Sequence, residues 1–413
     1  MARLPGGPQH PLTPPVVAVP VPAVWDDDGV HDSVIGVVDG HNDLPWRMRQ
    51  VDYDFARRDI AGPQPELHTD LPRARQGGLA AQFWSVFVPC SLRGADAVTA
   101  TLEQVDFVHE MVARYPEDLR LVTSAAGLQS CLDDGPSGPI ACLLGAEGGH
   151  SIDGSLGVLR NLHRLGVRYL TLTHNENTDW ADSATDIPQH DGLTDFGRTV
   201  VAEMNRLGML VDLSHVSPAT MRDAMDASRA PVVFSHSSCR AVCDHPRNVP
   251  DPVLRDLAGN GGLVMITFVP AFVSPRVAEW QAELNEACRD AGVDPRDFEA
   301  RERFAGEQFR PSPGASLDDV VAHCEHAREV AGIDHIGLGG DFDGIATTTT
   351  GLEDVAGYPR LLEALAARGW STTDLRKLAS GNVVRVMRAA ESVATRLRAT
   401  TDPAWPPLRT EEG

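Results

Sequence analysis

The chain has 413 residues, 42% of them hydrophobic and 23% charged, so it can bury one large core with insertions or fold as two domains. It carries 58 acidic against 36 basic residues, a formal net charge of −22, and such a surface repels nucleic-acid backbones and anionic membranes. The seven cysteines are odd in number and scattered, which does not fit a disulfide framework and favours a reducing compartment.

Both ends of the chain differ in composition from the middle. Residues 1–30 form a proline-rich arm, which we expect to be extended or disordered. Its apolar stretch is broken by prolines too often for a signal-peptide core or a membrane span. Residues 396–413 form a tail without a hydrophobic anchor signal. We therefore expect a single folded domain at residues 31–395 and a cytoplasmic protein.

Eight short apolar runs, each bounded by turn residues, predict strands. They are almost continuously hydrophobic, as expected when both faces of a sheet are covered. The runs are VIGVVDG (34–40), QFWSVFVP (82–89), IACLLGAEG (140–148), YLTLTH (169–174), LVDLSH (210–215), PVVFSH (231–236), LVMITFVP (263–270) and HIGLGGDF (335–342).

Arginine supplies nearly all cations of the chain, since Lys377 is the only lysine. This bias is typical of a GC-rich bacterial genome.

Segments of helical periodicity lie between these runs and carry end signals. Thr194 is placed to cap a helix that stops at Gly208. Ser217 caps the next helix, with Pro218 at its first position. The last segment begins with a serine and two acids and closes on Gly332. The four segments are 101–115, 193–208, 217–228 and 316–332.

The alternation of strands and helices predicts an α/β fold with parallel strands. The simplest closure is a (β/α)8 barrel of the TIM type, and a doubly wound open sheet is the alternative. Residues 271–315 break the alternation after the seventh strand, and we expect a helical insertion that lies near the substrate. The end of the chain predicts one or two C-terminal helices that pack on the barrel.

Residues that can bind metals follow six of the eight predicted strands. In a parallel barrel all strands end at one rim, the face that holds the active site, so these side chains would converge there. Imidazole and carboxylate groups together are the ligands of Zn²⁺ and similar ions. A single catalytic zinc takes about three protein ligands, so the larger set predicts two ions with a shared carboxylate. The residues are His41, Asp43, Glu147, His174, His215, His236 and Asp341.

Each of these residues also has a simpler explanation. Glu147 in GAEGG could cap a helix, and GGDFDG could be an acidic turn, in which we expect Asp343 to be structural. His174 opens a polar loop that could face solvent. The remaining histidines are expected to be structural: His10, His31, His68, His109, His150, His163, His190, His245, His323, His326 and His335.

A serine nucleophile is the competing chemistry, because Ser235, Ser237 and Ser238 surround His236. The sequence has no G-x-S-x-G elbow, and a serine and a histidine adjacent in sequence rarely face each other. A nucleotide-binding fingerprint is absent too, since GLGGDFDG lacks the required spacing. The residues therefore favour metal chemistry.

Seven stretches of the sequence, in order, resemble the membrane (renal) dipeptidase family. The members of that family are binuclear zinc enzymes of the amidohydrolase superfamily. The similarity runs from about residue 34 to about residue 395. It implies a barrel with two divalent ions, expected to be Zn²⁺. The stretches are DGHNDLPW, GAEGG, YLTLTHNENTDWADS, VDLSHVS, FSHSS, RNVPD and GLGGDFDG.

The resemblance implies a ligand set for each metal. His41, Asp43 and Glu147 would hold the first ion. Glu147, His215 and His236 would hold the second, with Glu147 bridging the two.

The resemblance also implies three residues that act on the substrate. His174 matches the histidine that binds the carbonyl oxygen as the tetrahedral intermediate forms. Arg247, in HPRNVPD, matches the arginine that grips the C-terminal carboxylate, a task suited to a guanidinium fork. Asp341 matches the carboxylate that takes a proton from the bridging water and passes it to the leaving amine. The alternative role for Asp341 is a further metal ligand.

The implied activity is hydrolysis of dipeptides, including those with a C-terminal D-residue, by a metal-bridging hydroxide. Hydrolysis of lactones or cyclic amides is one alternative, and a catalytically silent metal-bound barrel is another. Mammalian members of the family are secreted, disulfide-linked and lipid-anchored, whereas this sequence leads us to expect a cytoplasmic protein. The expected partner is the dipeptide substrate, with a homodimer as a candidate assembly and neither nucleic acid nor membrane.

Overall fold

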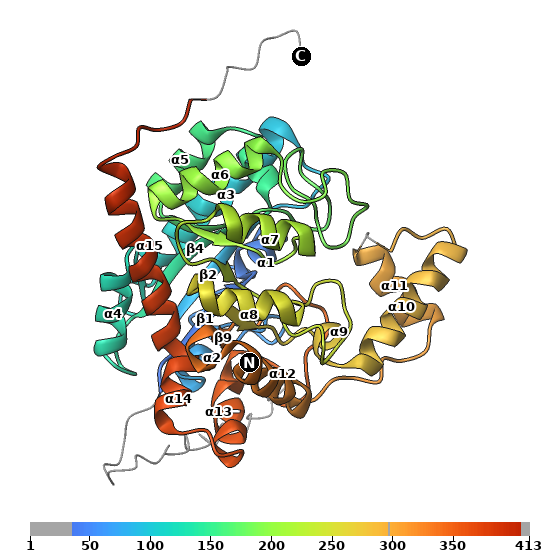
Figure 1. The fold of residues 1–413 in the computed structure, drawn as a ribbon. Helices are drawn as coiled ribbons and strands as arrows, with labels where there is room; N and C mark the ends of the chain where they lie inside the picture. The colour runs from blue at the N-terminus through green and yellow to red at the C-terminus, as the bar shows by residue number, and fades with distance from the viewer. Residues whose placement is uncertain (1–34, 296–297, 406–413) are drawn as a thin grey trace, which may run out of the picture.

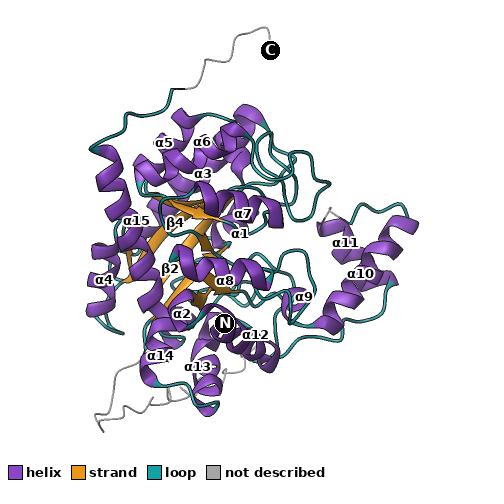
Figure 2. Cartoon of the chain, viewed as in Figure 1, coloured by secondary structure: helices purple, strands orange, loops and turns teal. Residues whose placement is uncertain are grey.

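The computed structural model describes residues 35–295 and 298–405. Within these ranges eight parallel strands close into a barrel, because β2 pairs with both β1 and β4 and β9 pairs with β1. Helices surround the strands, as Figure 2 shows. The closed sheet confirms the predicted (β/α)8 fold and excludes the open doubly wound sheet. The barrel strands are β1 (Val37–Asn42), β2 (Leu79–Phe87), β4 (Ile140–Glu147), β5 (Val167–Thr171), β6 (Leu210–Asp212), β7 (Val233–Phe234), β8 (Leu263–Ile266) and β9 (Ile336–Leu338).

A further strand, β3 (Leu119–Leu121), is absent from the sequence prediction. It pairs with the first residues of β4, while β5 pairs with β4 only from Leu144 onward. β3 therefore fills the space beside β4 below the start of β5. A strand of three residues has too little hydrophobic pattern to stand out in a sequence.

The helices cover the outside of the barrel and follow the chain around it (Figure 1). Those between barrel strands are α1 (Leu44–Arg49), α2 (Leu71–Gln76), α3 (Gly94–Arg114), α4 (Ala125–Asp133), η1 (Gly149–Ile152), α5 (Leu156–Arg164), α6 (Asp195–Leu207), α7 (Pro218–Ala227), α8 (Asp251–Asn260), α9 (Pro270–Val273), α10 (Pro275–Asp290), α11 (Phe298–Gln308), α12 (Leu317–Ala331) and η2 (Ile333–His335). After β9 come η3 (Val355–Gly357), α13 (Tyr358–Ala367), α14 (Thr372–Arg376), the π-helical turn η4 (Lys377–Gly381) and α15 (Asn382–Arg398).

The predicted ends of three helices are confirmed, whereas the helix predicted at 101–115 begins earlier, at Gly94. The Thr194 side chain accepts the Gly197 N–H at the start of α6, and Gly208 ends that helix with a φ of +83°, which glycine adopts without strain. Ser217 caps α7. A reciprocal capping box between Ser316 and the third helical residue opens α12. These local signals fix where the helices begin and end.

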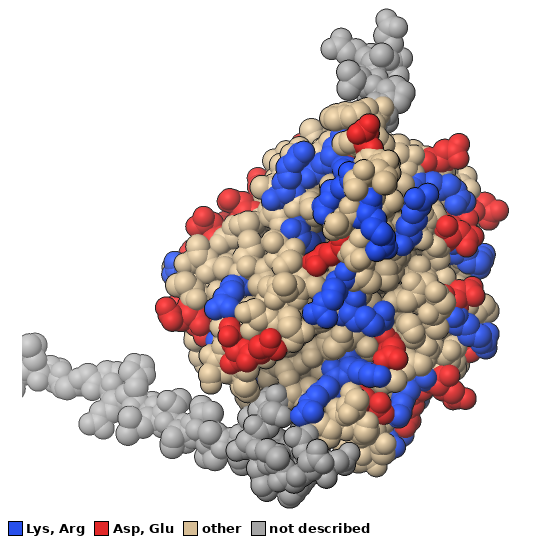
Figure 3. Space-filling view, turned by 60° about the vertical axis from the view of Figure 1, so that its left-hand side comes forward, with Lys and Arg blue, Asp and Glu red and all other residues tan. Residues whose placement is uncertain are grey.

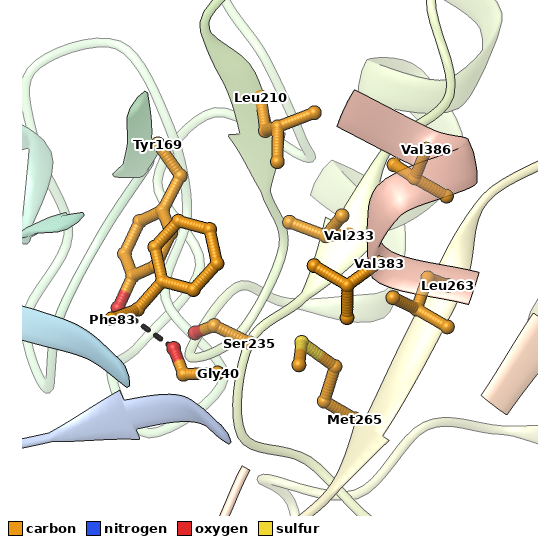
Figure 4. Close-up of a pocket in the computed structure, with 10 residues that line it drawn as sticks. All are labelled: Gly40, Phe83, Tyr169, Leu210, Val233, Ser235, Leu263, Met265, Val383 and Val386. Atoms are coloured by element: carbon orange, nitrogen blue, oxygen red, sulfur yellow. Dashed lines mark hydrogen bonds between the residues drawn. The ribbon is translucent and has the colours of Figure 1, made fainter. Parts of the chain in front are cut away.

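The amino-terminal end of the barrel is closed by α15. Val383 and Val386 of this helix face Leu210 and Leu263, which begin β6 and β8 (Figure 4). The space between them and the ring of Tyr169 holds only about 10 Å³. The barrel interior is therefore a packed core, and the layer above it carries the polar strand ends.

The predicted insertion is helical: α9, α10 and α11 lie between β8 and β9, and α10 and α11 project from the barrel (Figure 1). The expected arm at 1–30 and the end of the expected tail lie outside the described residues. The domain boundaries at 31 and 395 stay predictions. In the described part of the chain, the helices are too short or too polar to cross a membrane.

Candidate metal centre

The predicted ligand residues converge at the carboxyl end of the barrel. They form three overlapping groups in which one ligand atom from each residue lies within 4.8 Å of the others. The first group joins the ends of β1, β4 and β7, and the second those of β4, β5 and β6. The third joins the ends of β1 and β9. The groups are His41–Glu147–His236, Glu147–His174–His215 and His41–Asp43–Asp341.

Glu147 lies at the centre of the cluster, and its two carboxylate oxygens face different partners. Oε2 is 3.4 Å from His41 Nε2, whereas Oε1 is 3.0 Å from His215 Nε2 and 3.4 Å from His236 Nε2. On the other side of His41, Nε2 is 3.3 Å from Asp43 Oδ2. One buried carboxylate thus connects two sets of ligand atoms, which is the arrangement a bridging ligand requires.

The orientation of His41 is set by Tyr169. The Tyr169 hydroxyl donates to the Gly40 carbonyl at 3.2 Å, seen as the dashed line in Figure 4. Because the only hydrogen of this hydroxyl is used in that bond, its oxygen acts as the acceptor, and the His41 Nδ1–H donates to it at 2.9 Å. His41 Nε2 is therefore the nitrogen that faces the Asp43 and Glu147 carboxylates.

His236 is oriented in the same way by Ser235. The Ser235 hydroxyl donates to a carboxylate oxygen of Asp212 at 2.6 Å, so His236 Nδ1 donates to Ser235 Oγ at 2.8 Å. The expectation that this serine and histidine would not face each other is wrong. Ser235 is buried and its proton is committed to Asp212, so it orients the imidazole.

Two residues of the cluster have a left-handed backbone, with φ values of +70° for His215 and +63° for Asp341. Such a conformation costs on the order of 1–3 kcal/mol in a residue with a side chain. The His215 carbonyl accepts the Ala184 N–H at 2.7 Å, and the Asp341 N–H donates to the His41 carbonyl at 3.2 Å. Tertiary hydrogen bonds therefore hold both side chains toward the cluster.

The charges of the cluster suit metal binding. Burial lowers the pKa of His215 and of His236 well below the usual range, so both rings are neutral ligands at neutral pH. Burial acts to raise the pKa of Glu147, but His41 and His215 outweigh it and hold this pKa well below its usual range. Burial lowers the pKa of His41, but Tyr169 and the Glu147 and Asp43 carboxylates raise it well above its usual value. The carboxylates thus stabilise a positive charge at His41 Nε2, whether a proton or a metal ion.

The cluster passes a structural test for a metal site. His41 Nε2, Asp43 Oδ1 and His215 Nδ1 are buried without a hydrogen-bond partner among the described residues. Buried polar atoms are normally paired, because an unpaired one costs about 1–3 kcal/mol. The other carboxylate oxygen of Asp43 faces His41, and the other ring nitrogen of His215 faces Glu147. Imidazole and carboxylate groups together are the ligands of Zn²⁺ and similar ions.

Asp341 lies at the edge of the cluster, partly exposed. Burial and the Asp43 and Glu147 carboxylates raise its pKa well above the usual range, against the lowering effect of His41 and Arg247. A carboxyl group with a raised pKa is suited to proton transfer near neutral pH. Asp343, two residues on, is not part of the cluster: its carboxylate accepts the His68 N–H at 2.7 Å, and its own N–H donates to His68 Nδ1.

His174 lies on the open side of the cluster, with its Nε2 3.9 Å from Glu147 Oε1. Burial lowers the pKa of His174 to about 4, so the ring is neutral at neutral pH. Its Nδ1 is 3.6 Å from the Cys90 sulfur, and its ring lies 4.7 Å from that of Phe87. Its side chain is 14% exposed, which leaves it accessible from the barrel mouth.

Arg247 is buried beside the cluster, on the loop after β7. Its guanidinium donates to Ser237 Oγ and to the His236 carbonyl, each at 3.4 Å. Burial lowers its pKa to about 10, so it keeps its charge at neutral pH. The guanidinium lies 5.2 Å from the ring of Phe272, which α9 supplies from the insertion. Both hydrogen bonds of this buried guanidinium are long, so it remains available to bind an anionic ligand.

Four residues that shape the site are absent from the sequence prediction: Tyr169, Asp212, Cys90 and Phe272. Ser235 enters that prediction only as a candidate nucleophile. Tyr169 is the first residue of a predicted strand, and an inward position there is the only sequence signal for it. The remaining histidines within the described part of the chain stay outside the three ligand groups.

A closed parallel barrel with imidazole and carboxylate side chains gathered at its carboxyl rim is the arrangement of a metal-binding enzyme. The model of the family described as membrane dipeptidase (peptidase family M19) matches residues 31–401. The chain therefore belongs to the membrane dipeptidase family.

Individual relatives agree with this family. Dipeptidase 3 of Rattus norvegicus is 43% identical over 368 residues, which cover 86% of this chain and 65% of the relative, so the chain spans less than two thirds of that protein. The crystal structure of dipeptidase AC, a metallo peptidase of family M19, is 28% identical, covers 86% of this chain and 98% of its own, and gives a TM-score of 0.72. A metallo peptidase from Rhodobacter sphaeroides, solved with a phosphinate mimic of the dipeptide L-Ala-D-Ala, is 27% identical, covers 87% of this chain and 100% of its own, with a TM-score of 0.72.

Proposed function

We propose that the protein is a metal-dependent dipeptidase. The observation that carries the proposal is the position of Arg247, a buried charged guanidinium whose neighbours are the carbonyl of one ligand residue and the acids of the cluster. A fixed cation beside a hydrolytic metal site selects substrates that carry a free carboxylate close to the scissile bond. A dipeptide has that carboxylate one residue from the bond.

We propose two divalent ions, expected to be Zn²⁺, at this site. His41, Asp43 and Glu147 would hold the first, and Glu147, His215 and His236 the second. The two faces of the Glu147 carboxylate support the bridging role. Bound ions of this kind supply Lewis acidity toward the peptide carbonyl and make hydroxide available near neutral pH.

Three residues of the chain would act directly on the substrate. Arg247 binds the C-terminal carboxylate and places the peptide bond over the cluster. His174 is neutral and faces the cluster through Nε2, so it can donate a hydrogen bond to the carbonyl oxygen as negative charge develops there. Asp341, with its raised pKa, accepts the proton of the attacking water and donates it to the leaving amine.

Dipeptides with a C-terminal D-residue are part of the proposed substrate range. The support is the metallo peptidase from Rhodobacter sphaeroides, which was solved with a mimic of L-Ala-D-Ala. The insertion supplies Phe272 beside Arg247, so this segment is placed to influence which C-terminal residue is accepted.

The test compares a dipeptide that has a C-terminal D-residue with its C-terminal amide, on the wild type, Arg247→Met and Arg255→Met. Arg255 is exposed on α8 and serves as the matched control. We expect Arg247→Met to lower kcat/KM for the free acid by roughly 10²-fold or more, because a buried charge pair is worth about 2–5 kcal/mol. Arg255→Met should match the wild type. Equal turnover of acid and amide, or turnover that survives removal of metal by a chelator, would contradict the proposal.

Hydrolysis of lactones or cyclic amides is the second candidate, supported by the same metal-binding rim. Neutral cyclic substrates lack a carboxylate, so their turnover should be insensitive to Arg247→Met. A silent barrel is the third, and it predicts bound metal without turnover of either substrate class. These outcomes separate the three functions.

We also infer a reducing location such as the bacterial cytoplasm. The support is that all seven cysteines are free in the structure, with Cys90 alone partly exposed. The homodimer stays a prediction, as does the lack of nucleic-acid and membrane partners, which the net charge of −22 supports.

A further inference from the structure

A second cavity lies at the end of the barrel opposite the metal centre. Its volume is about 320 Å³, at the lower end of the range for small-molecule pockets. Its apolar lining includes Leu210, which begins β6, Met387 of α15 and Leu207 at the end of α6. The cavity lies away from the ligand cluster, because β6 begins here and His215 follows the other end of that strand.

Two arginines bring positive charge to the lining. Arg168 of β5 donates to the carbonyls of Thr123, His163 and Val167, and Arg398 of α15 donates to the Leu207 carbonyl. Among the described residues, neither guanidinium has a carboxylate within ion-pair distance, although the protein carries 22 more acidic than basic residues. Figure 3 shows Lys and Arg side chains gathered on the face that carries α15 and α4.

The pKa of His163, which also lines this cavity, reflects the positive charge around it. Burial, followed by the charges of Arg168 and Arg398 and of two arginines farther off, lowers the pKa of His163 to about 4. The imidazole is therefore neutral at neutral pH and can donate one hydrogen bond. An anionic group placed among these side chains would meet two cations and a polar donor.

One acid, Glu391 of α15, lines the same cavity. Its Oε1 accepts the Ala125 N–H, which opens α4, at 2.6 Å. Burial lowers the pKa of Arg168, and the charge of Glu391 acts against this effect. The cavity therefore combines two cations and one anion with an apolar part of its lining. This pattern complements a small molecule that carries both charges.

We propose that this cavity binds a small zwitterionic carboxylate of the class of free α-amino acids. The carboxylate lies between Arg168 and Arg398. Arg398, whose Nη1 alone donates to Leu207, offers Nε and Nη2 for two parallel hydrogen bonds, and Arg168 adds Nη2, since its Nε and Nη1 already donate to carbonyls. The ammonium group faces Glu391, and an aliphatic side chain packs on Leu210 and Met387. The site is independent of the proposed dipeptidase activity, because no residue of the metal centre takes part in it.

The experiment uses the full-length, metal-loaded protein with ¹³C-labelled methionine methyl groups, which gives nine methionine signals. The Met387 signal is assigned from its loss in Met387→Leu. Leucine, 4-methylpentanoate, 3-methylbutylamine and inorganic phosphate are then titrated in turn. We expect leucine to shift the Met387 signal saturably. The acid without the amino group should bind at least about tenfold more weakly, since one charge-assisted hydrogen bond is worth roughly 1.5–3 kcal/mol.

Three variants test the assignment of the charges. Arg398→Gln should remove the response to leucine, whereas Arg396→Gln, an exposed neighbour on the same helix, should keep it. Glu391→Gln keeps an oxygen for the Ala125 N–H, and it should weaken leucine binding while 4-methylpentanoate, which has no ammonium group, binds as well as before or better. Arg398→Lys retains the charge if Arg398→Gln does not fold, and should bind leucine with reduced affinity.

Several outcomes would overturn the proposal. Leucine bound only at the barrel mouth would shift methionine signals other than Met387. Phosphate or 4-methylpentanoate binding as tightly as leucine would show a simple anion site instead of a zwitterion site. A leucine response that survives in Arg398→Gln would exclude the assigned carboxylate position.

Discussion

The hydroxyl of Tyr169 lies 2.9 Å from His41 Nδ1 and donates its own hydrogen bond to the Gly40 carbonyl, so it decides which nitrogen of His41 faces the Asp43 and Glu147 carboxylates. Tyr169 is fully buried, and burial raises its pKa above the usual range, so the phenol stays protonated. The residue that orients this proposed metal ligand thus comes from β5, on the other side of the barrel interior.

Replacing Tyr169 by phenylalanine should therefore weaken metal binding with little change in fold. Loss of such an orienting hydrogen bond typically costs about 10–100-fold in metal affinity. The affinity can be measured by competition with a chromophoric chelator. Tyr115→Phe is the matched control, because it removes a hydroxyl that bonds to Asp59 outside the site. If both variants bind metal as the wild type does, the orienting role of Tyr169 is wrong.

Gly145 provides the room that the Tyr169 ring occupies. A Cβ at this position would lie 1.9 Å from the ring atom Cζ of Tyr169, a distance that no side chain tolerates. Gly145→Ala should displace the ring, lower the free energy of unfolding by about 1–3 kcal/mol and weaken metal binding together with it.

Denaturant unfolding and chelator competition on Gly145→Ala measure the two effects separately. Gly259→Ala, on α8 with open space around its Cβ position, is the control and should leave both quantities unchanged or slightly improved. A variant that loses stability but keeps full metal affinity would show that the ring moves without moving His41.

The sequence predicted the eight barrel strands and the convergence of their polar ends because both depend on local patterns. A buried parallel strand is a short apolar run, and the residue that follows it must lie at the carboxyl rim whatever the rest of the chain does. The helix ends at Thr194 and Ser217 follow from side-chain capping, which is equally local.

The residues that orient the ligands could not be predicted in this way. Tyr169 and Asp212 act through neighbours on other strands, and their own stretches do not show which residues they will contact. Phe272 reaches Arg247 only because α9 folds back over the rim. Arg247 itself lies in a loop, so only the family resemblance pointed to it. Contacts between distant segments depend on how the barrel closes, and the local sequence pattern does not show which side chains then meet.

Asp341→Asn should separate proton transfer from metal binding. Asparagine keeps the shape of the side chain but cannot carry a proton between water and amine, so we expect kcat to fall by about 10²–10⁴-fold. KM should stay close to that of the wild type, because the proposed contact between Arg247 and the substrate carboxylate is unchanged. The measurement is steady-state kinetics on a dipeptide, together with metal content per chain. Loss of metal along with activity would favour the alternative, in which Asp341 is a further ligand.

His323 should contribute to acid sensitivity at a place far from the metal centre. It is fully buried on α12, its Nδ1 accepts the Cys239 N–H at 3.0 Å, and its Nε2 donates to the Val273 carbonyl at 3.2 Å. Burial lowers its pKa to about 4, from an ordinary value of 6.5. A proton on Nδ1 would break the bond to Cys239, so the folded state resists protonation.

The sign follows from proton uptake. Between about pH 6.5 and about pH 4 the unfolded chain binds a proton at this histidine and the folded chain does not, so the free energy of unfolding falls as the pH falls. The stability that this histidine loses between about pH 7.5 and about pH 5 is roughly 2 kcal/mol, at a limiting slope of about 1.4 kcal/mol per pH unit. His323→Gln can keep both hydrogen bonds without titrating. Urea unfolding of the metal-loaded protein at about pH 7.5 and about pH 5 should therefore show a smaller loss for the variant than for the wild type. Metal release in acid affects both proteins alike, and an equal loss in the two would rule out His323 as the source.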